Sequence, residues 1–224
     1  MRNLILSPLI LDITEYILPL NPTQVFGNQN DNALEIGFGE GDFLIELARK
    51  KTDWNFIGIE IKRKRLVKAI KKAERSQLKN IRFLLMDAQI AISEVFSKDS
   101  FSEVYINFPD PWPKERHKKH RFINIPFLRR LSLIMKPGAI LEIVSDHKEY
   151  IDYILEAIQE AKTFRAEFEY PHYITVPPSD RPKTRYELEF RKEGREIYYL
   201  RFINEKKEDK INETHCNNSA TDAS

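Results

Sequence analysis

Short apolar segments alternate with longer amphipathic ones along most of the chain. Five short segments, rich in β-branched and aromatic residues, are typical of buried parallel strands. They span Ala33–Gly37, Asn55–Glu60, Ile81–Met86, Glu103–Phe108 and Ala139–Ser145. Apolar residues at helical spacing predict helices between and after these strands. The helices cover Asp42–Lys50, Arg63–Ser76, Ala88–Phe96, Pro126–Met135 and Lys148–Lys162. This alternation predicts an α/β fold, in which a doubly wound, mostly parallel sheet carries helices on both faces.

The last part of the predicted domain departs from this alternation. Phe164–Tyr170 and Ile197–Ile203 predict two strands that close the edge of the sheet and bring it to seven strands. Between them, Thr175–Glu187 is rich in proline and charge, which indicates a long functional loop. Doubly wound sheets bind ligands at the carboxyl ends of their strands, near the switch in strand order, so we expect the chemistry there.

The 224 residues correspond to one domain with terminal extensions. Residues 1–30 contain Pro8, Pro19 and Pro22 and predict an N-terminal arm across the domain, which itself covers residues 31–204. Residues 205–224 are polar and have no apolar periodicity, which predicts a disordered tail.

Composition narrows the class of protein. The chain has 36 Lys+Arg and 34 Asp+Glu, a net charge of +2, so a signal for nucleic-acid binding has to come from local clusters. No run of 18 apolar residues occurs, and the short apolar start has no signal-peptide cleavage site, so we expect no membrane association. The single cysteine, Cys216, lies in the polar tail without a metal-binding pattern, which predicts a cytoplasmic protein with neither disulfides nor a metal site.

The first predicted strand leads into a glycine-rich turn. Its glycines are Gly37, Gly39 and Gly41. They permit a tight turn and a close approach of the backbone to a ligand, but their spacing is not GxGxxG. Glu35 lies in this strand, Glu60 ends the second strand and Asp87 follows the third. Acids at three strand ends suit a cationic nucleoside such as S-adenosylmethionine better than an anionic dinucleotide. The alternative is a set of ordinary turn glycines and exposed acids.

The fourth predicted strand ends at Phe108–Trp112, with the sequence Phe-Pro-Asp-Pro-Trp. Prolines restrict the backbone and so hold Asp110 with little freedom. Two basic segments accompany these sites: Lys114–Arg121 follows directly, and Lys62–Lys72 follows the second strand. Such clusters give sequence-independent affinity for nucleic acid, the alternative being a solvated charged surface.

Four segments together resemble the bacterial tRNA (guanine-N7-)-methyltransferases. They are Glu35–Gly39 (Glu-Ile-Gly-Phe-Gly), Phe108–Trp112 with the basic segment after it, Ser145–Asp146, and Thr184–Glu187 (Thr-Arg-Tyr-Glu). The segments occur in the expected order between about Gly27 and Phe202, and Phe-Pro-Asp-Pro-Trp is the most specific of them. The resemblance implies a Rossmann-like, S-adenosylmethionine-dependent methyltransferase domain, tRNA as the partner, and a variable-loop guanosine as the target.

The resemblance also implies roles for individual residues. Cofactor-binding positions are Glu35, Gly37, Gly39, Glu60, Asp87 and Asp110. Substrate positions are Lys114, Asp146, Thr184, Arg185, Tyr186 and Glu187. RNA-contacting positions are Arg116, His117, Lys118, Lys119, His120 and Arg121. Asp110 also matches the catalytic position, and His120 stands where another basic residue is more common. Both a monomer and a homodimer are compatible with the sequence.

The chemistry of guanine N7 defines what Asp110 has to do. N7 has a lone pair and no proton, so methyl transfer needs no base to deprotonate the nucleophile. We therefore expect Asp110 to orient the guanine through N1–H and N2–H₂ and to stabilise the developing positive charge. Arg185 and Tyr186 are expected to hold the sugar–phosphate and the base, with Asp146 as a second acceptor.

Three other classes of protein remain as alternatives. An exocyclic-amine methyltransferase is one, because Asn107–Trp112 is similar to the shorter Asn-Pro-Pro-aromatic turn of those enzymes. A non-catalytic RNA-binding module would keep the basic segments but has no need of acids at the strand ends. An NAD-dependent dehydrogenase fits least, because the glycine spacing differs. The methylated atom of the product and the binding of S-adenosylmethionine distinguish these classes.

Overall fold

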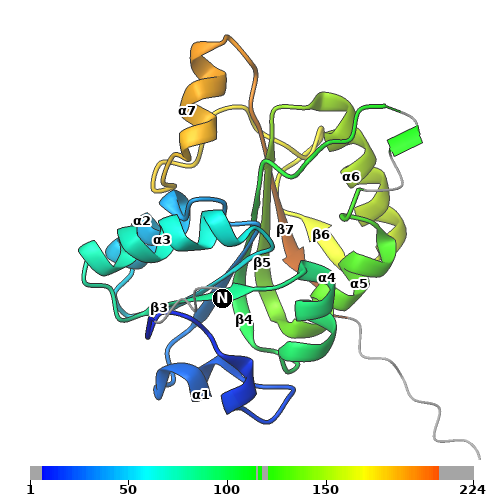
Figure 1. Ribbon diagram of the computed structural model, residues 1–224. Helices are drawn as coiled ribbons and strands as arrows, with labels where there is room; N and C mark the ends of the chain where they lie inside the picture. Colours follow the sequence, from blue (N-terminus) through cyan, green and yellow to red (C-terminus); the bar gives the residue numbers. More distant parts are fainter. Residues whose placement is uncertain (1–6, 115, 118–120, 207–224) are drawn as a thin grey trace, which may run out of the picture.

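The computed structural model describes residues 7–114, 116–117 and 121–206, and a seven-stranded sheet is its central element (Figure 1). Its strands are β1 (Asn32–Ile36), β2 (Asn55–Glu60), β3 (Ile81–Leu85), β4 (Phe101–Asn107), β5 (Met135–Ser145), β6 (Phe164–Ala166) and β7 (Tyr198–Asn204). They lie in the order β3-β2-β1-β4-β5-β7-β6. β1 to β5 are parallel, whereas β7 pairs antiparallel with β5 and β6. The predicted doubly wound, mostly parallel sheet is thus confirmed. Most of the predicted tail, with Cys216, lies outside the described residues.

Helices cover both faces of the sheet, as Figure 1 shows. One face carries α2 (Asp42–Lys50) and α3 (Arg63–Arg75). The other carries α4 (Ala88–Ile90), the π-helical turn η2 (Ala91–Val95), α5 (Ile125–Ile134) and α6 (Lys148–Ala161). α7 (Arg185–Lys192) lies beyond the carboxyl ends of the parallel strands. No helix in the described ranges is long and apolar enough to cross a membrane.

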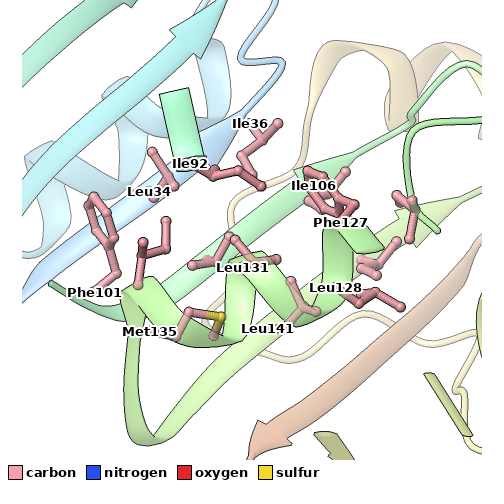
Figure 2. Packing of buried hydrophobic residues seen from close by; sticks show 14 of the residues in the cluster. Leu34, Ile36, Ile92, Phe101, Ile106, Phe127, Leu128, Leu131, Met135 and Leu141 are labelled. Carbon is pink, nitrogen blue, oxygen red and sulfur yellow. The ribbon is translucent and has the colours of Figure 1, made fainter. Parts of the chain in front are cut away.

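The alternation of side chains along β1 divides the core into two parts. Leu34 packs in the same cluster as Leu131 of α5 (Figure 2). Ala33 belongs to the second cluster, with Leu44 of α2. Because successive residues of a strand point to opposite faces, Glu35 shares the α2 side with Ala33. All five residues of β1 are buried, and Glu35 is the one acid among them.

Residues 7–30 pack against the domain along β3 and η2. They include a short 3₁₀ turn, η1 (Ile13–Glu15), and the short helix α1 (Pro22–Phe26). The Leu11 N–H donates to a carbonyl of β3 at 2.9 Å, and the Leu20 N–H donates to a carbonyl of η2 at 2.8 Å. Both leucine side chains are buried, so hydrogen bonds and apolar packing together attach this segment.

Several element boundaries differ from the predictions. The fifth strand, predicted to begin at Ala139, begins at Met135. The predicted helix Ala88–Phe96 is split between α4 and η2, and the predicted strand Phe164–Tyr170 ends at Ala166. The prediction of a loop over Thr175–Glu187 is wrong at its end, because α7 begins at Arg185. Charged residues occupy most of α7 and Glu187 alone in this helix is buried, so no apolar period marks it in the sequence.

Candidate functional site

Two adjoining clefts lie at the carboxyl ends of the parallel strands. β1 pairs with β2 on one side and with β4 on the other, and doubly wound sheets bind ligands at such a switch in strand order. The larger cleft has a volume of about 470 Å³ and the smaller about 230 Å³. Both are lined by Gly37, Arg65, Asn107, Phe108, Pro109 and Asp110. This shared wall puts Asp110 at the junction of the two clefts.

The structure brings most of the predicted site residues to these clefts. The larger cleft is also lined by Glu35, Gly39, Asp146, Thr184, Arg185 and Tyr186, and the smaller by Glu60 and Asp87. Lys114 and Glu187 line neither cleft. Three other lining residues, Arg65, Asn107 and Phe190, were not among the predicted site residues. Arg65 belongs to the basic segment Lys62–Lys72, and Asn107 directly precedes the Phe-Pro-Asp-Pro-Trp segment, so both carried a signal in the sequence.

The turn after β1 is built from a backbone conformation that glycine adopts readily. Gly37 and Gly39 have φ angles of +76° and +60°, a region that costs other residues roughly 1–2 kcal/mol. The Gly39 N–H donates to Glu60 Oε2 at 3.1 Å, and the Lys62 N–H donates to Glu60 Oε1 at 2.9 Å. The turn therefore fixes the Glu60 carboxylate at the wall of the smaller cleft.

Asp87 caps α4 from the end of β3. Its Oδ1 accepts hydrogen bonds from the backbone N–H groups of Gln89 at 2.8 Å and Ile90 at 3.2 Å. Both bonds use the same oxygen, and the apolar residues Ile59 and Phe122 line the same cleft. An acid beside apolar walls suits a flat heteroaromatic ring that carries an amino group.

Glu35 is a buried carboxylate with one unsatisfied oxygen. Its Oε1 accepts a hydrogen bond from Asn107 Nδ2 at 2.9 Å, whereas Oε2 has no hydrogen-bond partner in the described part of the chain. Burial raises the pKa of Glu35 to about 7, an effect that the Asn107 hydrogen bond and the charge of Arg181 partly oppose. A buried acceptor without a donor is costly, so a cationic donor bound in the larger cleft would stabilise this group.

The segment around Asp110 has a constrained backbone. Phe108 and Trp112 have φ angles of +48° and +44°, which are uncommon for residues other than glycine. Pro109 and Pro111 restrict the backbone between them. Such conformations persist only where the surrounding structure holds them, so the exposed Asp110 side chain starts from a fixed backbone.

Arg121 anchors this segment and does not face solvent. Its Nε donates to the carbonyl of Pro111 at 2.7 Å, and its guanidinium lies over the rings of Tyr150 and Tyr153. The side chain is only 1% exposed. The geometry therefore does not support the predicted RNA contact at Arg121, because its donors are directed into the protein.

The rest of the basic segment is described only in part. Lys114 and Arg116 are exposed, and the half-buried His117 packs edge-on against Trp112, with ring centroids 5.8 Å apart. Arg116 Nε donates to His117 Nε2 at 3.2 Å. The predicted contacts at Lys118, Lys119 and His120 lie outside the described residues.

α7 contributes an aromatic wall to the larger cleft. Thr184 caps the helix, since its Oγ1 accepts a hydrogen bond from the Glu187 N–H at 2.9 Å. Tyr186 lies near Phe108 and Phe190, at centroid separations of 6.4 and 6.0 Å. The wall thus connects α7 with the segment that carries Asp110, which suits stacking of a planar base.

Two predicted substrate residues at the rim of the larger cleft form ion pairs. Asp146 Oδ2 is 2.8 Å from Arg195 Nη1, and Arg185 Nε is 2.8 Å from Glu189 Oε1. The Arg185–Glu189 pair is exposed and the Asp146–Arg195 pair is partly so, since Asp146 is half-buried. Ion pairs that solvent reaches contribute little to stability, so a ligand can displace them. Within the described ranges, no group of three or more His, Cys, Asp and Glu side chains is arranged to hold a metal ion.

Glu187, which sequence analysis assigned to substrate binding, is fully buried. Its Oε2 is 3.1 Å from Arg181 Nη1, and its Oε1 accepts hydrogen bonds from the Tyr199 hydroxyl at 2.5 Å and from Arg191 Nε at 3.3 Å. These contacts hold α7 against β7, so Glu187 supports the cleft without lining it. Sequence analysis missed Arg181, whose one signal is its place before Pro182 in the charged loop.

Comparison with known proteins identifies the family. Residues 29–200 match the family model described as "Putative methyltransferase". The tRNA (guanine-N(7)-)-methyltransferases of Thermus thermophilus and Thermotoga maritima are 33% and 34% identical over 83% and 84% of this chain, and that of Syntrophotalea carbinolica is 32% identical over 87%. The chain spans 58% and 61% of the length of the first two relatives and 83% of the third.

A solved structure with the same fold is that of a 16S rRNA methyltransferase, KamB. It superposes with a TM-score of 0.59 at 13% identity and covers 81% of this chain and 91% of its own. The family model covers most of the domain, and the named relatives align over more than four fifths of the chain. The chain therefore belongs to the tRNA (guanine-N(7)-)-methyltransferase family.

Proposed function

We propose that this protein transfers the methyl group of S-adenosylmethionine to N7 of a guanosine in the variable loop of tRNA. The observation that carries the proposal is the position of Asp110, which lies on a constrained backbone where two clefts meet. One cleft is lined by Glu35 and the aromatic residues of α7, and the other by Glu60 and Asp87. The names of the relatives support the same activity. We place this reaction in the cytoplasm, without a metal, in a monomer or a homodimer.

The acids of the two clefts fit S-adenosylmethionine. The buried Glu35 Oε2 lacks a donor, and the ammonium group of the cofactor would supply one. Glu60, held by the glycine turn, would bind the ribose hydroxyls, and Asp87 would bind the adenine edge in the smaller cleft. When bound, S-adenosylmethionine supplies an electrophilic methyl group beside a positively charged sulfur. The negatively charged carboxylates attract this positive charge and so favour S-adenosylmethionine over an anionic ligand.

The other residues of the site orient the guanine. Because N7 carries no proton, Asp110 does not need to act as a base; it accepts hydrogen bonds from N1–H and N2–H₂ and stabilises the cationic base that forms. Tyr186 and Phe108 offer aromatic surface on which the base can stack. Holding the reacting atoms in line lowers the barrier by several kcal/mol, up to about 7–11 in ideal cases. Exposed Lys114 and Arg116 suit contacts with tRNA phosphates.

A methyl-transfer assay tests the proposal. Purified full-length protein is incubated with unmodified tRNA transcripts and labelled S-adenosylmethionine, and the product is analysed by nucleoside mass spectrometry and by strand scission at 7-methylguanosine. We expect 7-methylguanosine in the variable loop. Label on another atom of the tRNA would contradict the proposed reaction, and absence of label would contradict the activity on tRNA.

Asp110→Asn tests the role of the central carboxylate. We expect kcat at saturating tRNA to fall by about 10²–10³, as when a preorganised electrostatic group is removed. Asp99→Asn is the matched control, because Asp99 is an exposed acid just before β4, at the other end of the strand. It should retain the wild-type kcat. Near-normal turnover of Asp110→Asn would contradict the orienting and electrostatic role.

A further inference from the structure

Arg181 is an arginine buried in the loop that precedes α7. Its side chain is 3% exposed, and its Nε lies 2.6 Å from Glu142 Oε1. Its Nη1 donates to the Pro182 carbonyl at 3.0 Å and to Glu187 Oε2 at 3.1 Å, and its Nη2 donates to Asn107 Oδ1. Burial of a guanidinium is costly unless such contacts satisfy its donors. Three of the four contacts hold the loop in place, whereas the fourth reaches the cleft.

That fourth contact determines how Asn107 faces Glu35. The Asn107 side chain stands between the two, with Oδ1 toward Arg181 and Nδ2 donating to Glu35 Oε1 at 2.9 Å. An asparagine amide can present either end to a neighbour, but a guanidinium has only donors. Arg181 therefore selects the orientation in which the NH₂ group meets the carboxylate. An ionised Glu35 also attracts the NH₂ group, but without Arg181 the amide can turn and its carbonyl can accept a hydrogen bond from protonated Glu35, which favours the protonated form.

We propose that Arg181 is a positioning residue for cofactor binding: through the amide of Asn107 it holds Glu35 so that Oε2 remains available to the ammonium group of S-adenosylmethionine. This inference rests on the proposed function, because it takes S-adenosylmethionine as the ligand of the larger cleft. Oε2 is buried and has no hydrogen-bond partner in the described part of the chain, as an acceptor reserved for a ligand would be. Arg181 itself does not line the larger cleft, so it acts on the ligand only through its neighbours.

The charges around Glu35 support this role. Burial and, to a smaller extent, Asp42 of α2 favour the protonated form and bring the pKa of Glu35 to about 7. The Asn107 hydrogen bond, the charge of Arg181 and the backbone N–H of Leu44 favour the ionised carboxylate. Glu142 and Glu187 pair with Arg181 and offset part of its charge. Those two acids are also approached by Arg201 and Arg191. Loss of Arg181 therefore raises the pKa of Glu35 further, and a cationic ligand then binds tightly only at higher pH.

The test measures the affinity of the full chain for S-adenosylhomocysteine, which retains the ammonium group, by calorimetry from pH 6 to 8.5. Arg181→Gln is expected to weaken binding about tenfold at pH 7, the loss typical of one hydrogen bond to a charged group, and to shift the rise in affinity to higher pH. Asn107→Asp keeps an acceptor for Arg181 but turns an oxygen toward Glu35, so it should weaken binding at least as much.

Arg191→Gln is the matched control. It removes a cation from the same acid, Glu187. Within the described part of the chain, Arg191 contacts Glu187, Thr175 and Tyr199 but not Asn107, so its loss should not alter the affinity or its pH profile.

Thermal melts and binding stoichiometry give the folded fraction of each variant. If Arg181→Gln is less stable but binds with wild-type affinity and pH profile, Arg181 is purely structural and the inference is overturned. If Arg181→Gln does not fold, Asn107→Asp decides: weakened binding supports the inference, and wild-type binding overturns it. If the wild-type chain binds no S-adenosylhomocysteine at any pH, the proposed function fails and this inference fails with it.

Discussion

Replacing Glu35 with glutamine should stabilise the ligand-free protein at high pH. Glu35 is almost fully buried, and burial raises its pKa from 4.5 to about 7. The folded state thus holds a proton that the unfolded state has already released between these two pH values. The contribution of Glu35 to the unfolding free energy therefore falls as the pH rises from about 4.5 to about 7, and stays at the lower level above pH 7. Glutamine has the same shape and no proton to lose, so Glu35→Gln should not show this fall.

The size of the effect follows from the two pKa values. At about 1.4 kcal/mol for each pH unit, ionising Glu35 in the folded protein costs about 3 kcal/mol. Part of that cost is already present at pH 5, because the unfolded carboxyl is mostly ionised there. The difference in unfolding free energy between Glu35→Gln and wild type should therefore grow by about 2–3 kcal/mol between pH 5 and pH 8.5.

Urea denaturation at pH 5 and pH 8.5, followed by circular dichroism without ligand, measures this difference. Glu46→Gln is the matched control, since Glu46 lies on the solvent side of α2 with 43% of its side chain exposed. Its difference from wild type should be the same at both pH values. If the difference in unfolding free energy between Glu35→Gln and wild type is also the same at both pH values, the folded protein ionises Glu35 at no cost. That result would refute the view that Glu35 is a buried acceptor stabilised by a bound cation.

Three further changes test other parts of the site. Gly41→Ala should destabilise the protein by more than Gly138→Ala, because both glycines have positive φ but a Cβ at Gly41 would lie 2.8 Å from the Ala69 Cβ; equal unfolding free energies would contradict this. Thr184→Ala should cost about 1 kcal/mol through loss of the helix cap, and Thr184→Ser should restore most of it; a serine variant as unstable as alanine would count against the cap. Tyr186→Ala should raise the KM for tRNA several-fold while Tyr186→Phe retains it, if the ring and not the hydroxyl contacts the base; equal KM values for the two variants would contradict stacking.

The acids at the strand ends could be predicted because they depend on local pattern. Glu60 and Asp87 follow short apolar segments, and the ends of parallel strands meet at one edge of a sheet. Arg121 and Glu187 show where this approach stops, since charge in a sequence suggests exposure while both side chains are buried. Their partners come from segments far away in the chain, which no local period reveals. α7 was missed for the same reason, because contacts of Glu187 with β7 and the preceding loop stabilise it.

The buried charges around Arg181 are better explained by orientation than by stability. Apolar residues of similar volume often hold a loop at least as well as a buried ion pair, because they avoid the cost of desolvation. An apolar side chain at position 181 has no donor for Asn107, however, and cannot select which end of that amide faces Glu35. The cluster also joins β4, β5 and α7 to one guanidinium, and losing one contact leaves a buried charge incompletely paired. The loop before α7 therefore has one favourable position, which also fixes the aromatic wall that α7 contributes to the larger cleft. The residues that fix this wall are the same ones that orient the buried carboxylate of Glu35.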